Sequence, residues 1–175
     1  DDDLEAVKVI GKLSENISTV FRNSRKQINY HSLKEEIQLT NNYLFIQKCR
    51  FGDKLNIEVP GIDTLAALET YNVPIMMVQI HAENAIEHGF SDIDFKGLVQ
   101  LTIHIKDKKL VVVISDNGKG LMASENKNSN HISRAIQITK DRLYLINKEK
   151  NTNSSYSVSN NVPHGVIIEL VLPLL

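Results

Sequence analysis

The sequence contains little cysteine, no tryptophan and no long apolar run. Its single cysteine, Cys49, excludes an internal disulfide framework and favours a reducing compartment. A formal net charge of −1 provides no long-range attraction to nucleic acid or anionic lipid, so we expect no nucleic-acid partner. No stretch reaches the length of a membrane span and no signal peptide is evident, so we expect any membrane anchor to lie upstream of Asp1.

Two amphipathic helices are predicted in the first third of the chain. Residues 4–24 place apolar side chains near helical spacing, although a helix that packs back on its own domain shows the same pattern as one that forms a dimer. Ser32 and Glu35 form a capping-box pattern that opens a second helix, which ends near Gly52. We therefore predict a helical linker over residues 1–52.

Strands and helices are mixed over residues 53–175 without strict alternation. Pro74 is predicted to start a helix that runs to His88. Residues 115–131 are a long polar stretch before a helix at 133–147. Alternating or continuous apolar runs predict strands at 55–59, 98–105, 110–114, 154–158 and 166–172. These patterns favour an α+β fold: a two-layer α/β sandwich with a mixed, mostly antiparallel sheet, helices on one face and an N-terminal helical extension.

The predicted helix before Gly89 has an apolar and a polar face. Its polar face carries Glu83, Asn84 and His88 within about one turn. A solvated surface would account for such a face. Chemically, however, Asn84 offers a neutral oxygen suited to Mg²⁺, Glu83 could act as a general base, and His88 could donate a hydrogen bond to phosphate.

A glycine-containing turn follows the apolar run at 110–114. Gly118 and Gly120 permit backbone angles or close ligand approach that a Cβ would obstruct. Asp116 could accept a hydrogen bond from the exocyclic amine of adenine and would repel the oxygen that guanine carries there. An ordinary tight turn would use the same residue types.

Taken in order, these two motifs resemble those of a known ATPase superfamily. Residues 83–89, Glu-Asn-Ala-Ile-Glu-His-Gly, and 116–120, Asp-Asn-Gly-Lys-Gly, resemble the N box and G1 box shared by gyrase, mismatch-repair ATPases and histidine kinases. Residues 33–37, 43–44, 50–53 and 139–143 resemble the linker and post-lid helix of the LytS-like sensor kinases in particular. The resemblance covers nearly the whole chain and implies a Bergerat-type ATP-binding kinase domain over residues 53–175.

The resemblance implies a role for each matching residue. Asn84 is then the Mg²⁺ ligand, Glu83 the catalytic acid or base, and His88 a phosphate-side residue. Asp116 is the adenine-binding carboxylate beside Gly118 and Gly120, and residues 121–132 form a lid. Where relatives carry a second glycine box, this sequence reads Ser133-Arg134-Ala135; Ser133 and Arg134 remain phosphate-binding candidates through helix amides and charge. Relatives often carry a small hydroxyl residue after the last glycine, and this sequence has Val166 at that position.

None of the six histidines has the neighbourhood of the group's phosphoacceptor, which we expect before Asp1. We interpret His31 as a surface or capping residue. The resemblance implies ATP and Mg²⁺ as cofactors, a homodimer in the full-length protein, a response-regulator receiver domain as partner, and the cytoplasmic part of an inner-membrane sensor. A degenerate, non-catalytic relay module and an ATP-hydrolysing member of the same superfamily remain alternatives.

Overall fold

A computed structural model describes residues 2–25, 30–59, 69–90, 94–121 and 129–174. The helices are α1 (Asp2–Arg25), α2 (Leu33–Phe51), α3 (Gln79–Asn84) and α4 (Ser129–Lys150), with a 3₁₀ turn at Gly52–Lys54 and a π-helical turn at Ala85–Gly89. The strands are β1 (Tyr30–Ser32), β2 (Leu55–Glu58), β3 (Asn72–Pro74), β4 (Gly97–Lys106), β5 (Lys109–Asp116), β6 (Ser155–Asn160) and β7 (Val166–Pro173).

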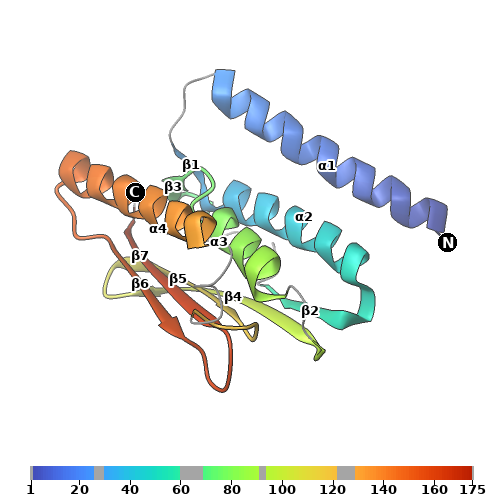
Figure 1. The fold of residues 1–175 in the computed structure, drawn as a ribbon. Helices are drawn as coiled ribbons and strands as arrows, with labels where there is room; N and C mark the ends of the chain where they lie inside the picture. The colour runs from blue at the N-terminus through green and yellow to red at the C-terminus, as the bar shows by residue number, and fades with distance from the viewer. Residues whose placement is uncertain (1, 26–29, 60–68, 91–93, 122–128, 175) are drawn as a thin grey trace.

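The main sheet has five strands in the order β2-β4-β5-β7-β6. β2 pairs with β4 in parallel and the other neighbours are antiparallel. Helices α2, α3 and α4 cover one face of this sheet, and α1 lies outside α2 as a further layer (Figure 1). The predicted α+β sandwich, with its mixed sheet and N-terminal helical extension, is therefore confirmed.

The core forms where the alternating strands meet the helical layer. Leu110, Val112 and Ile114 recur with period two along β5, so they share the face that the helices cover. Leu33 and Ile37 of α2 are fully buried in the same cluster. The helix predicted as part of the linker thus packs directly on the sheet.

Two helices, α4 and α3, begin at other residues than predicted. α4 begins at Ser129, so residues 129–132 of the predicted lid form its first turn. Residues 122–128 of that lid lie outside the described residues. The other predicted helices and strands agree with the structure to within a few residues.

Pro74 does not start a helix, which corrects our prediction. It ends β3 and pairs with Tyr30 of β1 in a small two-stranded antiparallel sheet, an edge position that tolerates a residue without N–H. The chain then turns, and α3 begins at Gln79. The N–H groups at this helix start bind a side chain from α2, a contact that local sequence does not reveal.

Candidate functional site

A small cavity lies between the helical layer and the carboxyl end of β5. Its volume is about 50 Å³, room for a water molecule or two. Its wall is built from α3 and the π-helical turn, the three strands β5, β6 and β7, the turn after β5, and α4. The lining residues are His81, Asn84, Ala85, His88, Gly89, Ile114, Asp116, Gly120, Leu121, Ile136, Tyr156, Val158, Val166 and Ile168.

Asp116 is the buried carboxylate of this cavity. It continues the alternation of β5, so its side chain lies on the same face as Ile114. The backbone N–H groups of Gly118 and Val166 donate to its Oδ1 at 2.8 and 3.3 Å. Burial raises the pKa of Asp116 to about 6, although these two hydrogen bonds lower it. A carboxyl group with this pKa is largely ionised at neutral pH and can accept a donor from a ligand.

Asn84 and His88 lie one turn apart and both line the cavity with Asp116. Three predicted site residues from two separate motifs therefore meet at one place. Glu83 does not line the cavity. Its Oε1 accepts a hydrogen bond from Gln79 Nε2 at 2.7 Å, and burial together with Glu87 and Glu36 raises its pKa despite that bond.

The two predicted motifs touch through their glycines. A Cβ on Gly118 would lie 2.5 Å from the Cα and O atoms of Gly89, and Lys119 N donates to Gly89 O at 3.1 Å. Gly118 therefore packs against the helix end and is absent from the cavity wall. Gly120 does line the cavity, and its φ of +78° is one that side-chain-bearing residues rarely adopt.

Residues 133–135 all belong to helix α4. The side chains of Ser133 and Arg134 lie outside the described ones, so their predicted phosphate contacts remain predictions. Ala135 is 3% exposed and does not have a positive φ. The conformation that would have required glycine is therefore absent at this position. Val166 forms part of the cavity wall and donates its N–H to Asp116.

Sequence reasoning missed a buried polar contact between His81, which lines the cavity, and Thr139 behind it. His81 is 1% exposed, stacks on Tyr156 with ring centroids 5.4 Å apart, and its Nε2 lies 3.0 Å from Thr139 Oγ1. Burial lowers the pKa of His81 to about 4, so it is neutral at pH 7. The sequence did contain a signal for this burial: His81 lies three residues before Asn84, at helical spacing among the apolar residues of the predicted helix.

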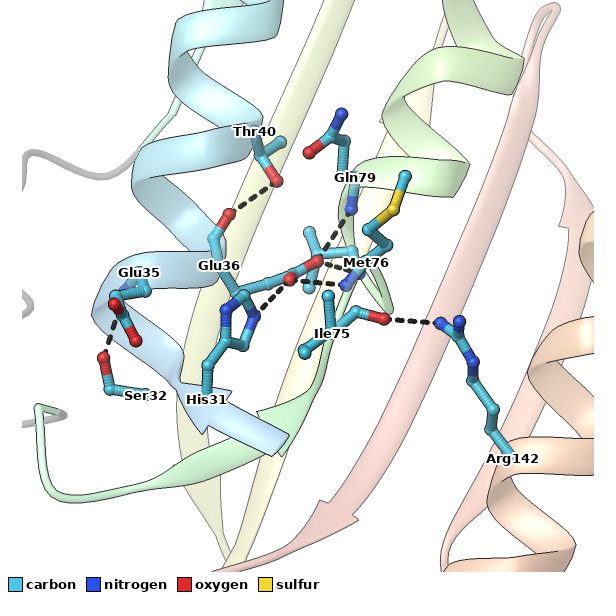
Figure 2. A network of polar contacts seen from close by, with 10 residues as sticks. His31, Ser32, Glu35, Glu36, Thr40, Ile75, Met76, Gln79 and Arg142 are labelled. Carbon is cyan, nitrogen blue, oxygen red and sulfur yellow. Dashed lines mark hydrogen bonds and ion pairs between the residues drawn. The ribbon is translucent and has the colours of Figure 1, made fainter. Parts of the chain in front are cut away.

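A buried carboxylate, Glu36, ties α2 to the turn before α3 (Figure 2). Its Oε2 lies 2.5 Å from His31 Nε2 and accepts the N–H of Met76 at 2.8 Å. His31 is 5% exposed, which corrects its interpretation as a surface or capping residue. The capping role belongs to Ser32, whose Oγ accepts the N–H of Glu35 as predicted.

The polar side chains that line the cavity are of types that suit a nucleotide bound together with a hard cation. Asn84 supplies one neutral oxygen, and Mg²⁺ commonly takes its other ligands from phosphates and water. Within the described ranges, no three His, Cys, Asp or Glu side chains gather as metal ligands. Across the same ranges, no helix combines the length and apolar character of a membrane span.

Comparisons with known proteins point to one family. A model of the histidine kinase family matches residues 1–55. Sensor protein LytS of Staphylococcus saprophyticus is 31% identical over 93 residues, which cover 53% of this chain and 15% of that protein. Sensor histidine kinase BtsS of Escherichia coli is 33% identical over 109 residues, covering 61% of this chain and 18% of that protein. The chain thus spans less than a fifth of these relatives.

A solved structure shows the same fold. The histidine kinase domain of a blue-light activated histidine kinase from Erythrobacter litoralis EL346 superposes with a TM-score of 0.54 at 21% identity, over 79% of this chain and 64% of that one. The match to the family model covers α1 and α2, whereas the superposition covers most of the fold. The superposition therefore shows the fold, and the similarity to the histidine kinase family rests on the sequence matches.

Proposed function

Because the chain is similar in sequence to sensor histidine kinases, LytS among them, we propose that it is the ATP-binding catalytic domain of such a kinase. In this proposal it transfers the γ-phosphoryl group to a histidine outside this sequence, from which the group passes to a response regulator. The observation that carries the proposal is the meeting of Asp116, Asn84 and His88 around one cavity. These residues come from two motifs about 30 positions apart, which folding brings together as the resemblance implies.

Each residue then has a chemical task. The Asp116 carboxylate accepts the exocyclic N–H of adenine and rejects guanine, which presents an oxygen there. The Asn84 side-chain oxygen holds Mg²⁺, whose charge offsets that of the phosphates. His88, one turn after Asn84 on the same wall, is assigned to the phosphate side, where the charge of Arg134 would add to binding.

Glu83 is proposed to act on the incoming histidine. It lies on the helix that carries Asn84, outside the residues that line the cavity, and its side chain is half-buried. Its raised pKa makes it a stronger base than an ordinary glutamate. Glu83 would accept or orient the proton of the attacking imidazole while a nitrogen–phosphorus bond forms and the bond to the ADP oxygen breaks.

The test is calorimetric titration of ATP with Mg²⁺ into the chain and into Asp116→Asn. We expect the variant to bind at least about tenfold more weakly, because a hydrogen bond to a charged group contributes about 1.5–3 kcal/mol. GTP should bind neither protein well. Asp107→Asn is a matched control, since Asp107 is exposed at the far end of β5 from Asp116. Equal ATP affinity in all three proteins would refute the adenine role.

One observation favours a second function. The cavity has a volume of about 50 Å³, which is small for a nucleotide base. A nucleotide-free module that dimerises and relays conformation would retain this small cavity. Folded protein that binds neither ATP nor adenosine would favour that function.

In the whole protein, we propose that this domain acts as a homodimer on the cytoplasmic side of a membrane sensor, where ATP and a response regulator are available. The known relatives are sensor kinases, and this chain covers only a small part of each. Its activity in the complete protein can be tested by autophosphorylation of a longer chain with and without Glu83→Gln.

A further inference from the structure

The helix that carries Asn84 does not cap its own beginning. α3 has six residues before its π-helical turn, and Val78, at its N-cap position, provides no side-chain cap. Four N–H groups at any helix start need acceptors from elsewhere. The placement of Asn84 therefore depends on whatever holds the turn at residues 75–78.

Glu36 of α2 supplies the acceptors for this turn. Its side chain is fully buried; Oε2 accepts the N–H of Met76, and Oε1 accepts those of Val78 and Gln79 at 2.7 and 3.0 Å. His31 Nε2 lies 2.5 Å from the same carboxylate. Figure 2 shows the carboxylate reaching from α2 across to the turn. Charge-assisted hydrogen bonds of this kind are stronger and shorter than neutral ones, so the contact fixes position.

The turn is also held from the other side by α4. Arg142 Nη1 donates to the carbonyl of Ile75 at 2.5 Å, as Figure 2 also shows. Met76 adopts a φ of +59°, a conformation that surrounding contacts must maintain in a residue with a side chain. The beginning of α3 is thus a junction between the helix that follows the N-terminal segment and the helix that follows the predicted lid.

Asp116 is positioned independently of this junction. It is fixed by the β5 ladder and by the N–H groups of Gly118 and Val166. The two ends of the proposed nucleotide site therefore have separate supports. The sheet supports the adenine end, and Glu36 supports the end that carries Asn84.

We propose that Glu36 is a positioning residue that sets the place of Asn84 relative to Asp116. It thereby couples the N-terminal helices to the phosphate end of the site. This inference rests on the proposed ATP-binding function. A shift of α2 would move the turn at 75–78 and change affinity for Mg²⁺ and phosphate while leaving the adenine contact in place.

The experiment compares two ligands by calorimetry: adenosine, which tests the adenine end alone, and ATP with Mg²⁺, which tests both ends. In Glu36→Gln the amide retains the shape but presents N–H groups where the turn and His31 also donate. We expect ATP with Mg²⁺ to bind about tenfold more weakly and adenosine to bind within about twofold of the original. A milder variant, His31→Phe, keeps a ring but removes one donor, and should change the ratio of the two affinities in the same direction.

Leu172→Ala is the control for general destabilisation. Leu172 is buried in β7 and pairs with Leu110, at the opposite end of β5 from Asp116. This variant should leave the affinity ratio unchanged at temperatures where it is folded. A Glu36→Gln protein that loses both affinities by the same factor, or neither, would overturn the inference. Absence of all binding by the unsubstituted chain would instead count against the proposed function itself.

Discussion

Asp116 extends the alternation of β5 by one residue, which places an ionisable group on an otherwise apolar face. Its folded-state pKa of about 6 lies above the usual 3.8, so the fold favours the protonated form. Folding stability should therefore be greatest below pH 3.8 as far as this group is concerned. It should fall as pH rises to about 6, by up to about 3 kcal/mol, and then remain level.

Ligand binding should show the opposite dependence on pH. The carboxylate form accepts the adenine N–H, so adenosine affinity should rise as pH increases through 6 and fall about tenfold per unit below it. Adenosine is the appropriate ligand because it has no phosphate that titrates in this range. Calorimetry at pH 5, 6 and 7.5 would test this prediction. Asp116→Asn should bind weakly at all three; a pH profile shared by both proteins would assign the titration to another group.

Addition of a single methyl group at Gly118 should have a large effect on the stability of the fold. In Gly118→Ala the new Cβ would lie 2.5 Å from the backbone of Gly89, so the contact between the two motifs must open. We expect a loss of about 1–3 kcal/mol in the free energy of unfolding, measured by urea denaturation. Gly11→Ala is the control: no atom lies within 4 Å, and alanine should stabilise helix α1 by up to about 1 kcal/mol. Equal effects at the two glycines would contradict the packing seen here.

The resemblance of the two motifs, taken in order, to those of a known superfamily was sufficient to predict that Asn84, His88 and Asp116 lie together. The sequence did not predict that Glu36 and His31 would be buried together, because Glu36 is held by backbone N–H groups 40 or more positions away. Glu36 does fall at helical spacing from Leu33 and Thr40, both buried, so its burial could have been predicted from the sequence. Its hydrogen-bond partners could not.

The loop of the hairpin between β4 and β5 contains two residues with side chains in a backbone conformation that favours glycine. Asp107 and Lys108 form a two-residue loop with φ values of +51° and +58°, as in a type I′ turn. Lys108→Gly should stabilise the protein by about 0.5–1 kcal/mol, because glycine adopts this conformation without strain. Thermal or urea unfolding would test this, with Lys108→Ala as the control that removes the side chain but keeps the strain. No gain over alanine would mean that the turn is unstrained.

Elements with strong periodicity were predictable, and those held by distant partners were not. The strands β4, β5 and β7 follow their apolar patterns because their inner faces bury against the helices. The start of α3 was placed too early because proline is common both at helix starts and at strand edges. Only the pairing of Pro74 with Tyr30 decides between these two positions.

On the scale of the whole molecule, α1 lies against α2 through its polar side. Lys12 Nζ donates to Asn42 Oδ1 at 2.8 Å, and Asn42 Nδ2 donates to Asn16 Oδ1 at 3.0 Å and to Glu15 Oε2 at 3.1 Å. Five apolar residues of the helix are exposed instead of packed on α2. The exposed stripe consists of Leu4, Val7, Ile10, Leu13 and Ile17, each 44% to 65% exposed. The alternative that the apolar pattern serves packing on the chain's own domain is therefore wrong for this stripe.

This stripe predicts self-association through α1. Burial of each aliphatic side chain contributes about 1.5–3 kcal/mol, so five of them can support a helix-to-helix dimer. Sedimentation velocity over a range of protein concentrations should show a monomer–dimer equilibrium that Ile10→Glu shifts to monomer. Ile105→Glu makes the same chemical change at an exposed residue of β4, away from α1, and should leave the equilibrium unchanged. Adenosine affinity should be the same in both variants, because neither residue lies near the cavity. A chain that stays monomeric at high concentration would show that two copies of α1 alone do not bury this stripe. Dissociation by both variants would place the contact elsewhere on the surface.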